Sequence, residues 1–276
     1  MSIKRWIPPA SGIKFNTAVE KHDAIANQYE SQYDTLYWRL YDDITWSHMR
    51  EEVIPNANGK LLDAGGGTGK WARKFAEEGF DVDVCDLADK MMDEGKKVIE
   101  KEGLADKVRF SKGDVCDIPF EDEEFDAVIC QGNPISYCEN PYLAISELSR
   151  VAKRNAPIIL SVHNKLAMIQ YFCFFMGKIT IDQALDLSKS SKVNIDYPIK
   201  AFEVDELTRV CEQNNMRVNN IIGKHTVTGY VQSEHYLSIL STKEGYEKAL
   251  FLETKHCKDQ TLLGLAGHLQ ISCTKL

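Results

Sequence analysis

Short apolar runs alternate with amphipathic stretches through the middle of the chain. Between Leu61 and Val162, each run typical of a buried strand is followed by a stretch with helical spacing of its apolar residues. The expected strands are residues 61–62, 80–85, 108–110, 125–130 and 158–162, and the expected helices are residues 71–78, 88–101 and 142–153. Strands that alternate with helices are joined by right-handed crossovers, so the pattern predicts an α/β fold with a doubly wound, mostly parallel sheet.

Two flanks surround this alternating core. Residues 17–54 are mainly helical in pattern, and Tyr29, Tyr33 and Tyr37 fall at i, i+4 and i+8, which places them on one stripe of a single helix. After Val162 the pattern predicts a helix at 204–214, a strand at 217–222, a helix at 246–255 and a strand at 269–273.

No Gly-, Ser- or Pro-rich linker divides the chain, so one elaborated domain is expected over residues 1–276. Its expected parts are an N-terminal helical cap (1–54), a core (55–162), an inserted segment after the fifth strand (163–202) and a C-terminal part of the sheet (203–276).

Composition removes several classes of protein. With 33 Lys and Arg against 41 Asp and Glu, the net charge is −8, which disfavours general nucleic-acid binding. The N-terminal stretch lacks the apolar region of a secretory signal, and the most apolar run, residues 166–177, is shorter than the ~20 residues of a membrane helix. The eight cysteines form no CxxC pair, so reduced thiols, no metal site and a cytoplasmic location are expected.

The sharpest motif is the glycine-dense turn after the first strand, Leu61-Leu62-Asp63-Ala64-Gly65-Gly66-Gly67-Thr68-Gly69-Lys70. Its register excludes a phosphate-binding Walker loop, which needs glycine at position 64 and Ser or Thr at position 71, where the chain has Ala64 and Trp71. The dinucleotide fingerprint G-x-G-x-x-G/A survives only if it starts at Gly67.

The pattern Asp63-x-Gly65-x-Gly67-x-Gly69 resembles motif I of class I S-adenosylmethionine-dependent methyltransferases, with a core like that of the ubiquinone and menaquinone methyltransferases. The resemblance implies a Rossmann-like, mostly parallel seven-stranded sheet. It also implies that the loop wraps the methionine part of the cofactor and that Asp63 helps to hold its amino group.

Further segments follow in the family's order. Asp86 lies 23 residues after Asp63, where the family's acid binds the ribose, and Met91 begins the helix that packs on adenine. Gly113 to Phe120 is similar to the family's GDxxDLPF segment, whose first Asp, here Asp114, receives the adenine amino group. Residues 147–153 are similar to the ELxRVLKPGG segment, but residues 154–157 replace its Pro-Gly-Gly turn. The resemblance thus implies a cofactor site made of Tyr33, Asp63, Gly65, Gly66, Gly67, Gly69, Asp86, Leu87, Met91, Asp114, Val115 and Gln131.

Ligands of such sheets bind beyond the carboxyl ends of the strands. Asn133 and Tyr137, just past strand four, are therefore candidates for contact with a methyl acceptor, and His163 at the end of strand five is the best placed candidate base. A base is needed only where the acceptor must lose a proton. The inserted segment begins with Met168, Ile169, Tyr171, Phe172, Phe174 and Phe175, which predicts a helical lid over the acceptor, with a dimer interface or core helix as the alternative.

The sequence thus favours in-line transfer of a methyl group to a small molecule through an N, O or C nucleophile. An amine and a hydrophobic quinone precursor both remain open as acceptors. The alternatives are an RNA or protein methyltransferase and a non-catalytic cofactor-binding protein. A nicotinamide-dependent enzyme is the remaining alternative.

Overall fold

The computed structural model describes residues 15–55, 59–194, 197–229 and 233–276. The stretch for which the sequence predicts no secretory signal lies outside the described residues, as does the start of the predicted N-terminal cap. The helices are α1 Ala18–Ile25, α2 Tyr29–Tyr33, α3 Leu36–Val53, α4 Lys70–Glu77, α5 Asp89–Lys101, α6 Pro134–Tyr137, α7 Pro141–Val151, α8 Lys165–Met168, α9 Ile181–Ser190, α10 Val204–Gln213, α11 Glu234–Leu240 and α12 Lys243–His256. Short 3-10 turns span Ala26–Gln28 (η1) and Leu263–Leu265 (η3), and a π-helix spans Ile169–Phe175 (η2).

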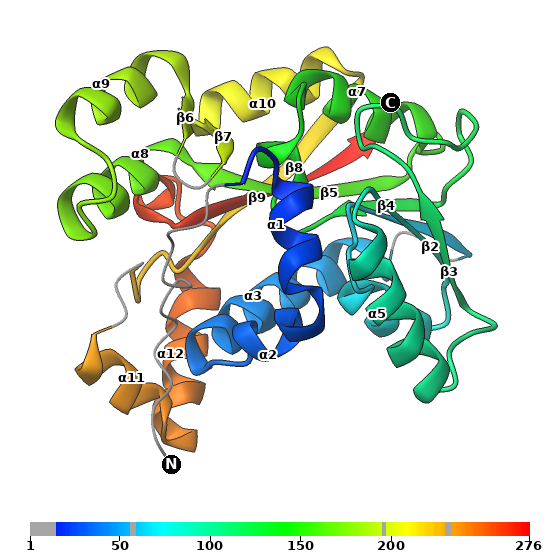
Figure 1. Cartoon of the computed structure of the whole chain (residues 1–276), viewed down its shortest axis with the longest axis horizontal. Helices are drawn as coiled ribbons and strands as arrows, with labels where there is room; N and C mark the ends of the chain where they lie inside the picture. The colour runs from blue at the N-terminus through cyan, green and yellow to red at the C-terminus, as the bar shows by residue number, and fades with distance from the viewer. Residues whose placement is uncertain (1–14, 56–58, 195–196, 230–232) are drawn as a thin grey trace.

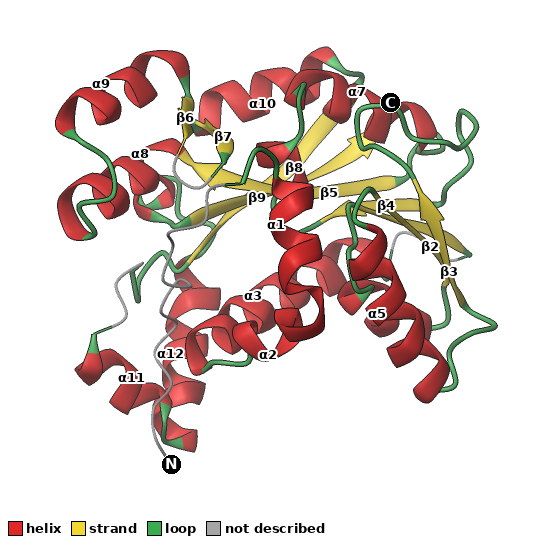
Figure 2. Ribbon diagram, in the orientation of Figure 1, coloured by secondary structure: helices red, strands yellow, loops and turns green. Residues whose placement is uncertain are grey.

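One twisted sheet runs through the molecule (Figures 1 and 2). Its strands are β1 Lys60–Ala64, β2 Asp81–Asp86, β3 Val108–Lys112, β4 Ala127–Cys130, β5 Pro157–Asn164, β6 Lys192–Asn194, β7 Pro198–Phe202, β8 Met216–Lys224 and β9 His268–Lys275. Parallel pairs give the order β3-β2-β1-β4-β5, and β9 and then β8 continue the sheet as antiparallel strands. The doubly wound, mostly parallel sheet is confirmed. A short β6–β7 hairpin adds to the last two residues of β5.

Alternate residues of each strand face opposite layers of helices. Leu62 and Val128 pack in the layer that contains α7 and α10, whereas Leu61 and Ile129 pack in the layer that contains α3, α4 and α5. Both faces of the central strands are therefore buried, which explains their continuous apolar runs.

The N-terminal tyrosines do not share one helix, so the prediction of a single stripe is wrong. Tyr29 and Tyr33 belong to α2, while Tyr37 lies in α3. The break comes at Asp34 (ψ 63°) and Thr35, whose hydroxyl accepts a hydrogen bond from the backbone N–H of Trp38 and so starts a new helix. Tyr37 consequently stacks on His225, with ring centroids 3.8 Å apart.

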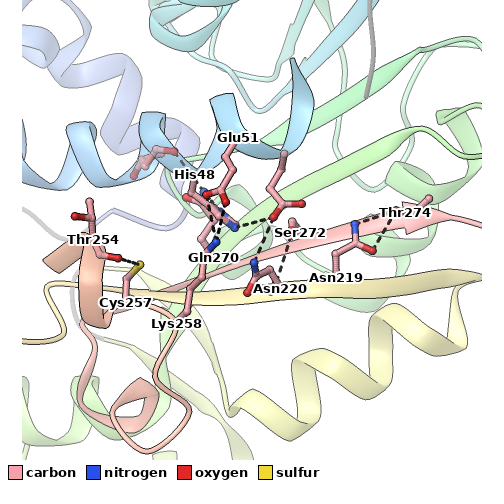
Figure 3. Close-up of polar contacts among 12 residues, drawn as sticks. His48, Glu51, Asn219, Asn220, Thr254, Cys257, Lys258, Gln270, Ser272 and Thr274 are labelled. Atoms are coloured by element: carbon pink, nitrogen blue, oxygen red, sulfur yellow. Dashed lines mark hydrogen bonds and ion pairs between the residues drawn. The ribbon is translucent and has the colours of Figure 1, made fainter. Parts of the chain in front are cut away.

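Helix α3 is fastened to the antiparallel edge of the sheet (Figure 3). The side-chain amide of Gln270 donates to His48 Nδ1 over 2.8 Å, and Asn220 Nδ2 donates to Glu52 Oε1 over 3.3 Å. Lys258 forms an ion pair with Glu51. Burial lowers the pKa of His48 to about 3, so its imidazole is neutral and can accept this hydrogen bond.

The inserted segment is helical, as expected, up to α9 and then ends in the β6–β7 hairpin. Its core contains Met168, Leu187 and Tyr197 and is completed by Ala18 of α1. The insertion and the first helix therefore pack together beyond the carboxyl end of β5.

The turn that replaces Pro-Gly-Gly uses Asn155 in the left-handed conformation, at φ 66°. Asparagine tolerates this region better than most residues, so it takes the place of a glycine. Nearby, Arg150 donates to the carbonyls of Ile118 and Phe120 and to the carboxylates of Glu147 and Asp122. It thereby holds the loop that follows Asp114.

We expect Arg150→Lys to destabilise the protein by about 1–3 kcal/mol, because one ammonium cannot replace the planar donor set and the loop carbonyls lose partners. Chemical denaturation measures this change. Arg50→Lys, at an exposed pair with Glu78, is the control and should have little effect. Equal stability of both variants would contradict the role of Arg150.

Candidate active site

The glycine loop after β1 leaves no room for side chains. Gly65, Gly67 and Gly69 all have positive φ angles, of 69°, 54° and 71°. A Cβ on Gly66 would lie 2.7 Å from Asp63 Cγ, and one on Gly65 would lie 2.4 Å from the ring of Pro134. Only glycine fits this path, which brings bare backbone to the cavity wall.

Asp63 lies beneath this loop, fully buried. Neither of its carboxylate oxygens has a hydrogen-bond partner of normal geometry among the described residues. Burial and, secondly, the charge of Asp86 raise its pKa from 3.8 to about 7, and the backbone of Ala72 at the start of α4 offsets part of this rise. A buried carboxyl without such a partner requires an explanation, and a ligand that brings a hydrogen-bond donor or a positive charge provides one.

Asp86 ends β2 and accepts hydrogen bonds from the backbone N–H groups of Gly67 and Ala88, each over 2.8 Å. These bonds tie the glycine loop to the β2–α5 turn. Asp114 accepts a bond from the N–H of Cys116 over 2.8 Å. Leu87 is 37% exposed beside this turn, whereas Met91 is buried under the glycine loop, where its Cε would lie 3.1 Å from a Cβ on Gly67.

A cavity of about 840 Å³ opens beyond these strand ends. It lies near the upper end of the ~300–1,000 Å³ typical of small-molecule sites. Most of the predicted site residues line it: Tyr33, Gly65, Gly66, Gly67, Asp86, Leu87, Met91, Asp114, Val115, Gln131, Asn133, Tyr137 and His163. Asp63 lies behind Gly66, and Gly69 packs toward Phe110 of β3 rather than lining the cavity.

The second half of the cavity is aromatic. Tyr137 Oη and His163 Nε2 share a hydrogen bond of 2.8 Å, and the ring of Tyr197 lies 5.4 Å from that of Tyr137. His22 of α1 lies 6.1 Å from Tyr137 and 5.8 Å from Tyr29, so helices of the N-terminal cap form one wall. Asn133 is 4% exposed, has a φ of 68°, and its side-chain oxygen has no hydrogen-bond partner among the described residues.

The histidines of this half are neutral at physiological pH. Burial lowers the pKa of His163 to about 3 and, together with the charge of Lys21, that of His22 to about 4. A base with so low a pKa takes up protons poorly near pH 7.

Residues that the sequence did not indicate also line the cavity, above all His22, Tyr197 and His268. They come from α1, from the approach to β7 and from the start of β9, so no local spacing links them. Phe172 lines the main cavity as expected. Phe175 does not: it is 58% exposed and borders a separate shallow groove with Phe174 and Leu265.

Within the described ranges, no three His, Cys, Asp or Glu side chains are grouped so that they could hold a metal ion. The described helices include none of the length and apolarity needed to cross a membrane.

A glycine loop over a buried acid, with a second acid at the end of the next strand, is an arrangement in which α/β enzymes bind nucleoside-containing cofactors. Comparison with known proteins gives the family. Residues 61–155 match the family model described as "Methyltransferase domain". The chain contains a class I S-adenosylmethionine-dependent methyltransferase domain, as the motifs predict, and this family implies S-adenosylmethionine as the cofactor.

Several known proteins are similar to the chain. The tRNA 5-carboxymethoxyuridine methyltransferase of Escherichia coli (strain K12) is 23% identical over 256 residues, which are 92% of this chain and 95% of that protein. The ubiquinone/menaquinone biosynthesis C-methyltransferase UbiE of Paracoccus denitrificans (strain Pd 1222) is 31% identical over 129 residues, 43% of this chain and 52% of that protein. The solved structure of an S-adenosylmethionine-dependent methyltransferase from Methanosarcina mazei shares the fold, with a TM-score of 0.58 at 15% identity, over 83% of this chain and 97% of that one.

Burial of Asp63 is unfavourable at high pH, where its carboxyl group is ionised, and this cost is what raises its pKa. The carboxyl is protonated more readily in the folded state than in the unfolded chain, so its contribution to stability falls as pH rises from about 4 to about 7. We expect Asp63→Asn to stabilise the cofactor-free protein at pH 8, by at most about 4 kcal/mol, and less at pH 5.

Thermal unfolding at the two pH values measures the effect, with the exposed Asp93→Asn as the control. A destabilised Asp63→Asn variant at pH 8 would show that the carboxylate has a partner in the free protein.

Proposed function

We propose that the chain transfers the methyl group of S-adenosylmethionine to a small molecule held in the aromatic half of the cavity. The observation that carries the proposal is the continuity of the cavity, which joins the glycine loop to Tyr137 and Tyr197. Such a cavity holds a cofactor and a second molecule side by side, and so brings two reacting atoms together.

The residues of the first half fit the cofactor. The buried carboxylate of Asp63, which has no hydrogen-bond partner of normal geometry in the described part of the chain, would complement the amino group of the methionine part. Asp86 would accept the ribose hydroxyls, while Asp114 and the backbone at Val115 would bind adenine against Leu87 and Met91. We also assign Gly65, Gly66 and Gly67 to the methionine end, together with the side-chain oxygen of Gln131, which accepts no hydrogen bond from any described residue. When bound, the cofactor supplies an electrophilic methyl group on a sulfonium.

In the second half, the chain orients the acceptor and excludes water. We assign contact with the acceptor's polar atom to the Tyr137 hydroxyl and the Asn133 amide. His163 is buried and neutral, so we give it the role of holding Tyr137 in place rather than that of a strong base. An acceptor whose nucleophile has already lost its proton needs no base for in-line displacement.

The N-terminal helices serve as a cover in this proposal. The rings of Tyr29 and Tyr33 lie 4.8 Å apart, and Tyr33 contacts Trp38 at 5.0 Å. Burial raises the pKa of Tyr33, so its hydroxyl stays protonated and can donate a hydrogen bond. The core, the inserted segment and this cap thus act as parts of a single domain.

A second candidate is methylation of a modified base in tRNA. The similarity to the E. coli tRNA methyltransferase extends over 92% of the chain, and the name of that enzyme refers to a small acidic group on a uridine. The net charge of −8 favours the free small molecule. Release of S-adenosylhomocysteine in assays with pooled metabolites and, separately, with bulk tRNA distinguishes the two.

We expect S-adenosylmethionine and S-adenosylhomocysteine to raise the melting temperature, while NAD and ATP leave it unchanged. At 100 times its dissociation constant, either ligand should add about 2.7 kcal/mol to the free energy of unfolding.

Asp86→Ala should weaken the binding of S-adenosylmethionine and S-adenosylhomocysteine by roughly 1.5–3 kcal/mol through loss of charge-assisted hydrogen bonds. The control Asp89→Ala removes an acid that pairs with Lys112 at the surface. The proposal fails if neither sulfur cofactor produces a shift.

The lid contains a matched pair of phenylalanines. We expect Phe172→Ala, which opens the wall of the main cavity, to raise the acceptor's Michaelis constant several-fold, while Phe175→Ala leaves it unchanged. Neither change should alter the affinity for S-adenosylhomocysteine, because neither residue lies near the glycine loop. Steady-state kinetics on the acceptor found above provide the measurement, and equal effects of the two substitutions would contradict a lid role for Phe172.

A further inference from the structure

A fully buried lysine stands directly behind the aromatic half of the cavity. Lys224 ends β8 and is 0% exposed. Its ammonium lies 4.1 Å from the ring centroid of Tyr41, which lines the cavity, and Lys224 is paired in the sheet with His268, which lines it too. One layer of side chains therefore separates this nitrogen from the cavity.

The surroundings of Lys224 are arranged for a charged amine. Its Nζ donates to Gln270 Oε1 over 3.1 Å. The amide nitrogen of Gln270 faces the carbonyl of Thr45 and His48 Nδ1 (Figure 3), so its oxygen is the end that faces the lysine. The face of the Tyr41 ring adds a cation–π contact.

No carboxylate forms an ion pair with Lys224 within the described part of the chain. Asp42 acts on Lys224 through its charge, but its carboxylate is paired with Lys70. The neighbouring titratable groups are His48 on α3, His225 just after β8 and His268 on β9, and burial keeps all three imidazoles neutral by lowering their pKa values. Burial also lowers the pKa of Lys224, and the charge of Asp42 opposes this. A buried cation that forms no ion pair of its own among the described residues is unfavourable, and it favours an anion placed nearby.

The position of Lys224 relative to the proposed acceptor is defined by a chain of contacts. The His163 ring lies 4.9 Å from that of His268, and His268 lies 5.2 Å from Tyr41. His163 in turn holds Tyr137. The field of the lysine therefore reaches the acceptor half through neutral aromatic groups, where it is screened less than in water.

We propose that Lys224 makes the cavity select a negatively charged acceptor. The acceptor then carries a carboxylate or an ionised hydroxyl group. This inference rests on the proposed function, because it concerns the molecule that shares the cavity with the cofactor. It favours an anion over an ammonium compound of the same shape, and so narrows the class of substrate.

Binding of three probes of similar shape and different charge tests the proposal. The protein saturated with S-adenosylhomocysteine is titrated with 4-hydroxybenzoate, 4-hydroxybenzamide and 4-hydroxybenzylamine by calorimetry. We expect the anion to bind about tenfold or more tightly than the amide, and the cation to bind most weakly. In Lys224→Met the anion and the amide should bind within about twofold of each other.

Lys224→Met is suited to this test, because it replaces an ammonium group that is costly to bury by an apolar chain of similar length. Lys200→Met is the matched control: Lys200 is also buried, but it pairs with Glu206 and lies against the rings of Tyr142 and Phe202, which do not line the cavity. It should keep the preference for the anion.

Equal binding of anion and amide by the wild type, an unchanged preference in Lys224→Met, or no binding of any probe would each overturn the inference. The affinity for S-adenosylhomocysteine, measured first in every variant, is the separate test of the proposed function. If that cofactor product binds and the charge preference is absent, only the role of Lys224 is wrong.

Discussion

The close approach between the glycine loop and the structures beneath it governs the arrangement of the site. Gly66 passes over the carboxyl of Asp63, and Gly65 passes against Pro134 at the start of α6, at distances that exclude any Cβ. These contacts join the ends of β1 and β4 into one surface. They fix where α6 starts, and with it the positions of Asn133 and Tyr137.

That constraint explains which parts of the site could be predicted from the sequence. Asp63, Asp86 and Asp114 lie at or just after the ends of strands whose apolar runs and spacing are visible in the chain, and parallel strands bring their carboxyl ends to one edge. The half of the cavity that we assign to the cofactor is thus built from local signals repeated along β1 to β4. The parallel core was predictable for the same reason, since its strands are apolar on both faces.

The acceptor half has no such local signal. His22, Tyr197 and His268 meet at Tyr137 and His163 only because α1, the β6–β7 hairpin and β9 converge past the end of β5. The prediction of one helical stripe for Tyr29, Tyr33 and Tyr37 was wrong because Thr35 caps a new helix. This capping interrupts the helix on which the i, i+4, i+8 spacing depends. Phe172 and Phe175 differ for a related reason: the π-helix between Ile169 and Phe175 turns them toward different surfaces, although the sequence presents them as one apolar run.

The two halves also differ in their electrostatics. The cofactor half contains the buried acids Asp63 and Asp86, whose pKa values burial raises, and these suit a ligand with an amino group and a positive sulfur. The acceptor half contains neutral histidines backed by Lys224. Helix α3 contacts both halves of the cavity. Near the glycine loop, its Asp42 pairs with Lys70. Near Lys224, it carries Tyr41 and His48. Because α3 is fastened to β8 and β9, a shift of the antiparallel edge would move both halves together. In this way the part of the sheet most distant from the glycine motif helps to set the geometry between them.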